Sequence, residues 1–153
     1  MSSNQQSVAS PGQQARLETI LEAAAETLGD ITPAVMALYY QRYPAARQSF
    51  VEHGCGYTAR LEAGMVDSAL YCLMTWFERP LEIDVTLADT VPHHAVLNIP
   101  IDYFVGLQEA VVDVIAGTLE PGDSSSRALL EELRAALVSR IRFYAAQGER
   151  APA

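Results

Sequence analysis

Lysine is missing from this chain: all ten basic side chains among its 153 residues are arginines. This absence excludes the mechanisms that need a lysine, such as phosphate-binding loops, Schiff-base catalysis and kinase chemistry. The chain has 19 acidic residues and ten basic ones, which gives a net charge of −9. An acidic balance argues against a nucleic-acid backbone or an anionic membrane surface as a partner.

Cysteine is also scarce, with only Cys55 and Cys72. They form no CxxC motif, so a disulfide framework and a zinc knuckle are excluded, and we expect a reducing, cytoplasmic compartment. No apolar run approaches the ~20 residues that cross a bilayer. The polar residues 1–12 lack the pattern of a signal peptide, and we expect them to form a disordered lead-in. We expect one domain over 13–147 and a frayed C-terminus over 148–153.

Within that domain, apolar residues recur at the three- and four-residue spacing of helices. The first such stripe consists of Leu17, Ile20, Leu21, Ala24 and Leu28. Helices are expected over 13–28, 44–50 and 59–78, with a second helix from Asp30 and a loop over 51–58. Two further helices are expected, one from Pro100 to about residue 119 and one after residues 124–126. The alternation of apolar residues over 81–98 is compatible with a strand, but without a partner strand we reject that interpretation. The pattern predicts an all-α domain of six to eight helices.

Two motifs have spacings that are typical of a known family. In Tyr43-Pro44-Ala45-Ala46-Arg47-Gln48-Ser49-Phe50, a proline is followed six residues later by a phenylalanine. The segment Ile99-Pro100-Ile101-Asp102-Tyr103 resembles the junction before the next-to-last helix of animal myoglobins, and the helix that follows ends in Pro121-Gly122-Asp123. In this order the motifs resemble the globin family over residues 13–147, as in single-domain bacterial-type members.

The resemblance implies a globin-like fold that holds haem b on a neutral imidazole. Counting back from Ile99 by the animal pattern selects His93 as the iron ligand. Counting back from Phe104 by the microbial spacing selects His94 instead. We favour His93 and keep His94 as the second candidate. Neighbouring residues on a helix point about 100° apart, so both cannot bind one iron from the same side.

The resemblance also implies the residues around the haem. The contacts that it implies are Phe50, Glu62, Met65, Val66, Ala69, Val96, Leu97, Ile99, Phe104 and Leu107. Met36 falls where many microbial globins carry a tyrosine, and it is either a sixth ligand through its thioether or part of the core. Tyr39 or Tyr40 offers a hydroxyl at this position only if the alignment of this helix with the globin pattern shifts by a few residues. Arg47 and Arg60 are the implied partners of the haem propionates. The helix 59–78 has neither His nor Gln, so we expect an apolar pocket for the gas.

Three other residues complete the expectations for the site. Pro92 directly precedes His93 and is expected to interrupt the helix, which would then begin near residue 90. His53 is expected to be an exposed loop residue, because too few metal-binding side chains surround it. Cys72 is expected to face the core and to be chemically inert.

Two functions follow from these observations. The first is a haem-binding globin that binds a diatomic gas (O₂, NO or CO) for sensing, storage or redox chemistry. Catalytic turnover would then require a separate reductase. The second is a haem-free globin-like module for sensing or protein interaction, as a homodimer or with a protein partner. Its structural mark would be a collapsed pocket filled by Met36, Met65 and Phe50.

Overall fold

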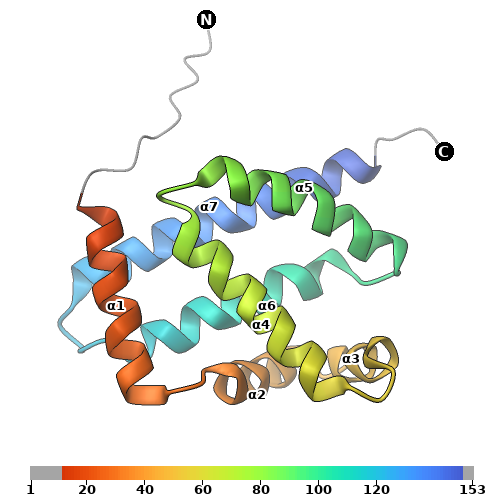
Figure 1. Cartoon of the computed structure of the whole chain (residues 1–153), viewed down its shortest axis with the longest axis horizontal. Coiled ribbons are helices and arrows are strands. Elements are labelled where there is room, and N and C mark those ends of the chain that lie inside the picture. The colour runs from red at the N-terminus through yellow and green to blue at the C-terminus, as the bar shows by residue number, and fades with distance from the viewer. Residues whose placement is uncertain (1–11, 150–153) are drawn as a thin grey trace, which may run out of the picture.

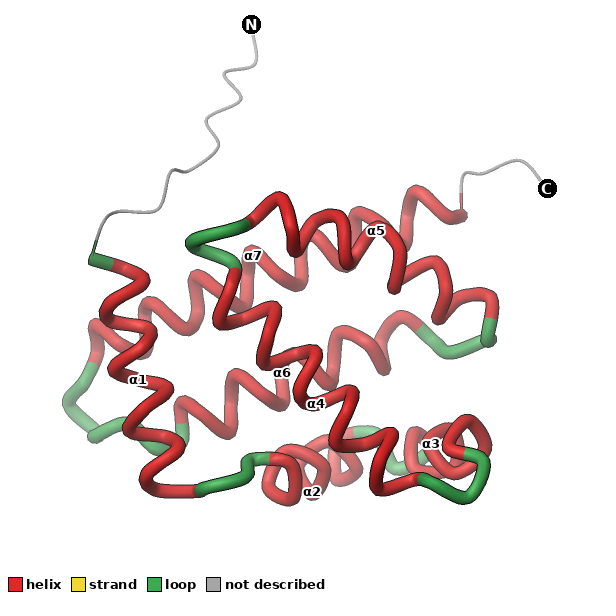
Figure 2. Tube along the Cα trace, in the orientation of Figure 1, coloured by secondary structure: helices red, strands yellow, loops and turns green. Residues whose placement is uncertain are grey.

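The computed structural model describes residues 12–149, and in this range the chain forms seven helices and no strand. The all-α prediction is therefore confirmed (Figure 1). In chain order the helices are α1 (Gln13–Leu28), α2 (Thr32–Arg42), α3 (Ala46–Gly54), α4 (Thr58–Thr75), α5 (Pro80–Val96), α6 (Ile101–Ala116) and α7 (Ser124–Glu149). The connections between them are short (Figure 2). None of the helices in this range is both long and apolar enough to cross a membrane.

Glycine, proline and aspartate lie at several helix ends. Gly29 has a φ of 63°, a conformation that glycine adopts without strain, and its N–H donates to the Ala25 carbonyl at the end of α1. α5 begins with Pro80, whose missing N–H costs nothing in a first turn. At the start of α7 the Asp123 carboxylate accepts the Ser126 N–H at 3.1 Å.

Some boundaries differ from the prediction. α3 continues to Gly54 and ends where Cys55 adopts a left-handed φ of 48°, so the expected loop over 51–58 is reduced to 55–57. α4 ends at Thr75 instead of residue 78. Residues 148 and 149, part of the expected C-terminal tail, belong to α7. Residues 1–11 and 150–153, the remainder of the two expected tails, lie outside the described residues.

The expected interruption at Pro92 is wrong, because α5 runs from Pro80 to Val96 with Pro92 inside it. Proline removes the hydrogen bond to the carbonyl four residues earlier and its ring crowds that carbonyl, but its fixed φ is compatible with a helix. On the same helix Ile83, Leu87 and Val91 are buried in the core. Their packing outweighs the local cost of the proline, so tertiary structure decides against the local preference.

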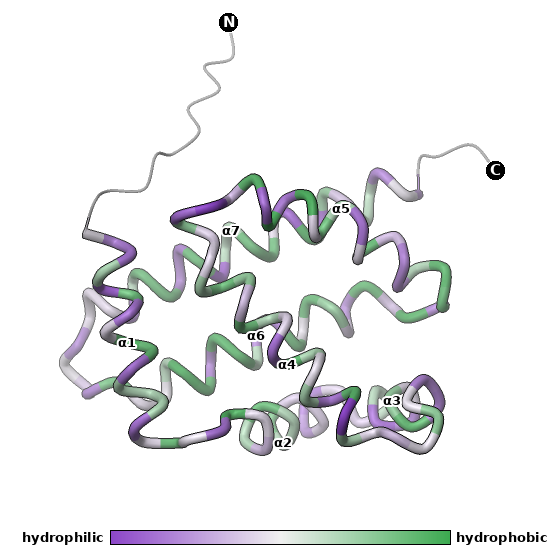
Figure 3. Tube along the Cα trace, in the orientation of Figure 1, coloured by the Kyte–Doolittle hydropathy of each residue, from purple (hydrophilic) through white to green (hydrophobic). Residues whose placement is uncertain are grey.

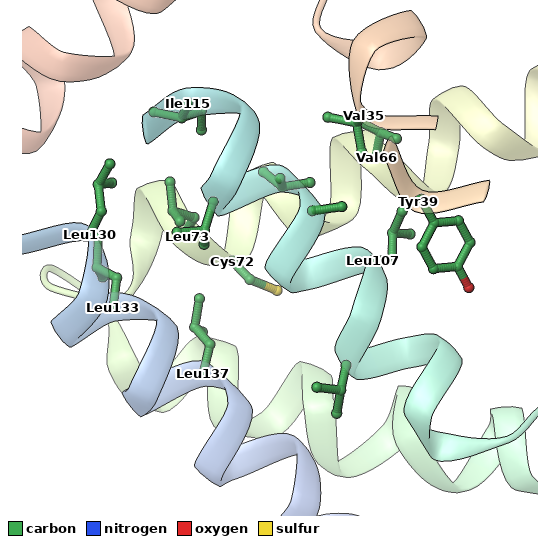
Figure 4. Packing of buried hydrophobic residues seen from close by; sticks show 14 of the residues in the cluster. Val35, Tyr39, Val66, Cys72, Leu73, Leu107, Ile115, Leu130, Leu133 and Leu137 are labelled. Atoms are coloured by element: carbon green, nitrogen blue, oxygen red, sulfur yellow. The ribbon is translucent and has the colours of Figure 1, made fainter. Parts of the chain in front are cut away.

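α6 lies at the centre of the molecule and packs against α1, α2, α4, α5 and α7. Its buried residues are Val105, Gly106, Leu107, Gln108, Ala110, Val111, Val112 and Ile115. Hydrophobic residues recur along every helix, with polar residues between them (Figure 3). The buried ones form one cluster, in which Leu130, Leu133 and Leu137 of α7 face α6 and α4 (Figure 4). α6 is thus the element against which the surrounding helices bury their apolar faces.

Candidate ligand-binding cavity

A cavity of about 440 Å³ lies among α3, α4, α5 and α6, with Tyr39 of α2 at one side. Its volume falls within the range of roughly 300–1,000 Å³ that small-molecule sites occupy. The lining is mostly apolar, and the few polar groups come from different helices. A cavity of this kind encloses a largely apolar ligand and contacts it at a few defined polar positions.

Nine of the thirteen residues expected to contact the haem or its iron line this cavity. They are Phe50, Met65, Ala69, His93, His94, Leu97, Ile99, Phe104 and Leu107. Met36 and Val66 do not line it and are buried in the core instead. Val66 follows Met65 by one residue, which turns its side chain about 100° away. Figure 4 shows Val66 near Val35 of α2, within the packed cluster.

His94 has the geometry of a neutral ligand. Its Nδ1 lies 2.8 Å from the Thr90 carbonyl oxygen, and a carbonyl only accepts hydrogen bonds. Nδ1 therefore carries the proton and Nε2 keeps its lone pair. The ring also stands edge-on to Phe104, with centroids 4.8 Å apart. Two contacts thus fix the orientation of the imidazole at the cavity wall.

The protonation state of His94 follows from its half-buried position. Burial lowers the pKa of this imidazole below its ordinary value, although the hydrogen bond to the Thr90 carbonyl acts in the opposite direction. His53 and His93 lower the pKa further. The ring is therefore neutral near pH 7, and the neutral ring is the form that ligates metals.

His93, the ligand that the sequence favoured, is the exposed member of the pair. The two rings are 6.3 Å apart and nearly perpendicular. The buried face of α5 passes through Leu87 and Val91 and reaches His94 at helical spacing, whereas His93 is turned about 100° from it. The geometry therefore favours His94 over His93 as the candidate ligand at the cavity.

Two further polar side chains at the cavity come from α2 and α6, and one of them is Tyr39, which the sequence left open as the source of a hydroxyl. Tyr39 lines the cavity, and its hydroxyl donates to the Tyr103 carbonyl at 3.0 Å. Burial raises the pKa of Tyr39, which keeps the phenol neutral. Gln108 of α6, only 3% exposed, donates from Nε2 to the Ala69 carbonyl at 3.2 Å. The polar amide at the cavity therefore comes from α6 rather than from α4.

His53 and Cys72 also line the cavity. His53 is exposed, as expected, but it lies in the last turn of α3 rather than in a loop, and its Nδ1 is 2.8 Å from the Ser49 carbonyl oxygen. Cys72 is buried, and burial raises the pKa of its thiol to about 11. The thiol therefore remains protonated near neutral pH, and a protonated thiol is a poor nucleophile.

Several expected contacts lie elsewhere. The Arg47 guanidinium stacks over the Tyr40 ring at 4.3 Å, and Arg60 lies over Tyr57 at 5.3 Å. Glu62 accepts a hydrogen bond from the Tyr40 hydroxyl at 2.7 Å. Neither arginine lines the cavity, nor does Glu62. Val96, expected at the edge of the haem, is 78% exposed and also does not line the cavity.

Leu61, Leu87 and Tyr103 line the cavity without having been singled out as contacts. Leu61 precedes Met65 by one helical turn, so the spacing on α4 could have identified it.

The donor set restricts which group the cavity can hold. Among residues 12–149, no cluster of three or more His, Cys, Asp or Glu side chains is arranged to bind a bare metal ion. A metal that brings most of its own ligands, such as haem iron, needs only one protein imidazole. No family model, curated protein or solved structure matches the chain.

Proposed function

We propose that this chain is a haem-binding globin that holds haem b on His94 and binds a diatomic gas (O₂, NO or CO) in the cavity. The observation that carries the proposal is the geometry of His94 at the wall of an apolar cavity. Metal-ligating histidines donate their second ring N–H to a carbonyl or a carboxylate, which fixes the tautomer and orients the ring. The bond from His94 Nδ1 to the Thr90 carbonyl is an interaction of this kind.

The apolar walls support the same function. Phe50, Met65, Phe104 and Leu107 offer surfaces for a flat macrocycle and exclude water from its iron. The sequence has no CxxCH motif for covalent attachment, so the implied group is haem b. Bound haem supplies an iron atom with a coordination position for a gas. Any turnover with NO or O₂ would draw electrons from a separate reductase.

The order of the motifs along the chain is a second line of support. Phe50 and Leu107, named from the spacing of globin sequences, both line the cavity although they are far apart in the chain. Figure 4 shows Leu107 of α6 next to Tyr39 of α2. Coincidental spacings in α3 and α6 would have no reason to converge on the same cavity.

The test is a haemin titration of the purified protein, followed by its absorption spectrum. We expect a sharp Soret band in the wild type and in His93→Ala, and loss of that band in His94→Ala. Free imidazole should restore the band in His94→Gly, because it replaces the missing ligand without a covalent link. Restoration would separate loss of a ligand from loss of the fold.

Two outcomes would contradict different parts of the proposal. A broad free-haemin spectrum that neither substitution changes would reject haem binding. Loss of the band in His93→Ala alone would leave the haem function standing and move the ligand to His93.

A second candidate function, the haem-free interaction module, is favoured by the outer side of α5. Leu81 and Val85 are both 68% exposed, and Val96 lies on the same side of the helix. Apolar stripes exposed in this way occur at protein interfaces. The collapsed pocket expected for this module is not what the structure has, since Phe50 and Met65 border open space. A molar mass of one chain by light scattering, together with haem uptake, would reject this candidate.

A further inference from the structure

Gln108 is a polar side chain on an apolar face of α6. Phe104, Gln108, Val111 and Ile115 follow one another at spacings of four, three and four residues, which places them on one stripe of the helix. Gln108 is 3% exposed, so its amide has almost no access to bulk water. Burying an amide is unfavourable unless its hydrogen bonds are replaced.

Only one end of this amide has a partner in the described part of the chain. Nε2 donates to the Ala69 carbonyl at 3.2 Å, and because that oxygen can only accept, the assignment of nitrogen and oxygen is fixed. No hydrogen bond to Oε1 is formed by any residue from 12 to 149. Oε1 keeps a small accessible surface, and the residue lines the cavity. Oε1 therefore offers its lone pairs to whatever occupies the cavity.

The neighbouring polar groups leave this acceptor available. The Tyr39 hydroxyl already donates to the Tyr103 carbonyl. The thiol of Cys72 lines the same cavity and forms no hydrogen bond to Gln108. The donor for this acceptor therefore comes from the occupant of the cavity, which is water in the empty protein and the bound ligand in the complex.

We propose that Gln108 makes the cavity selective for a small ligand that carries a hydrogen to donate, such as hydrosulfide or hydroxide. The inference rests on the proposed haem function and extends its ligands beyond the diatomic gases, which have no hydrogen. An oxygen lone pair attracts an S–H or O–H group and gives a bare diatomic no hydrogen bond. Gln108 is a selectivity residue of the cavity in addition to the iron ligand His94.

The test compares two anions that bind ferric haem and carry the same charge. Hydrosulfide has one hydrogen and cyanide has none, so the ratio of their affinities isolates the hydrogen bond. Gln108→Leu should weaken hydrosulfide binding by about twofold to tenfold, the range of one neutral hydrogen bond, and leave cyanide binding unchanged. Optical titration of the ferric Soret band measures both dissociation constants.

Two further variants separate the acceptor from packing. In Gln108→Glu, a protonated carboxyl donates to Ala69 and keeps an oxygen toward the cavity, so the wild-type ratio should be retained. Gln108→Met keeps the unbranched shape and should behave as Gln108→Leu, which provides a second variant if the leucine disturbs folding. Thr75→Val is the matched control, because Thr75 is a buried polar residue that does not line the cavity.

Equal changes in both affinities, or no change in either, would overturn the inference and leave Gln108 with a packing role. That result would leave haem binding intact, because the Soret band reports it independently. A wild-type protein that takes up no haem would overturn the proposed function and this inference together.

Discussion

The two halves of α6 have different surroundings. Toward the C-terminus, Val111, Val112 and Ile115 are buried in contact with the neighbouring helices, and we call this part of the molecule the packed region. Toward the N-terminus, Phe104 and Leu107 border the cavity, and we call the residues that line it the cavity region. The same helix contributes to both regions, with similar side chains in each.

The two regions differ in how completely their side chains are surrounded by other atoms, and not in which side chains they contain. An apolar side chain in the packed region touches other side chains on all sides, so it contributes fully to stability. An apolar side chain in the cavity region lacks partner atoms on one side and gains them only from a ligand. Stability should therefore depend mainly on the packed region and ligand binding mainly on the cavity region.

The largest expected difference comes from one substitution made in each region. Leu133 of α7 is fully buried in the packed region, and Leu133→Ala should cost about 4 kcal/mol of unfolding free energy. Leu107→Ala removes the same atoms from the cavity region and should cost about 2 kcal/mol, because Leu107 already lacks neighbours on one side. Urea unfolding of the haem-free protein measures both values. Equal costs would show that the cavity closes in solution.

Substitutions that add atoms should likewise cost more where side chains are closely packed than at the cavity wall. A Cβ on Gly106 would overlap the ring of Tyr43, which packs against α6 at this point. Gly106→Ala should therefore cost about 2 kcal/mol by overpacking, despite the better helix propensity of alanine. Ala69→Leu adds more atoms but places them toward the cavity, so it should change stability by less than about 1 kcal/mol. It should also reduce haem uptake.

Thermal unfolding with and without haemin measures these effects. Gly64→Ala is the matched control, because a Cβ at this position on α4 meets no atom within 4 Å. It should gain up to about 1 kcal/mol from helix propensity alone. A gain in Gly106→Ala as well would show that Tyr43 moves aside at little cost.

Most of the helices were predictable because their signals are local, whereas the first half of α5 was not predicted as a helix. Apolar residues recur along each stripe, and Gly29, Pro80 and Pro100 lie at helix boundaries. Pro92 was misleading because its local preference opposes the packing of α5, and packing is a property of the whole fold. A one-turn difference at the end of α4 has a similar origin, since helix ends depend on which groups satisfy the last carbonyls.

The cavity was predictable in part. Spacing located Phe50 and Phe104, because these residues follow prolines at fixed distances. The choice between His93 and His94 depends on the rotation of α5, which an interruption at Pro92 left undetermined. Gln108 had a visible signal, since it is a polar residue on an apolar stripe of α6. Its orientation toward Ala69 and the cavity depends on how α4 crosses α6, which the sequence does not encode locally (Figure 1).

The smallest expected effect concerns pH and tests whether the cavity wall at His94 is dry. Burial lowers the pKa of His94 below its ordinary value of 6.5, so in the window below 6.5 the unfolded chain binds more protons than the folded one. Stability of the haem-free protein should therefore fall on acidification from pH 7 through this window, by at most about 1.4 kcal/mol per pH unit for one proton.

Urea unfolding at several pH values should show this slope in the wild type and in His93→Leu, and a flatter slope in His94→Leu. The carboxyl of Asp113 does not contribute to the slope of stability against pH in this window. Burial alone would raise the pKa of that carboxyl, but hydrogen bonds from Arg134 and Arg42 outweigh burial and lower it below 3.8. Its stabilising contribution is therefore lost only in stronger acid. An unchanged slope in His94→Leu would mean that water reaches the His94 ring in solution. The packed region and the cavity region would then differ in hydration as well as in packing.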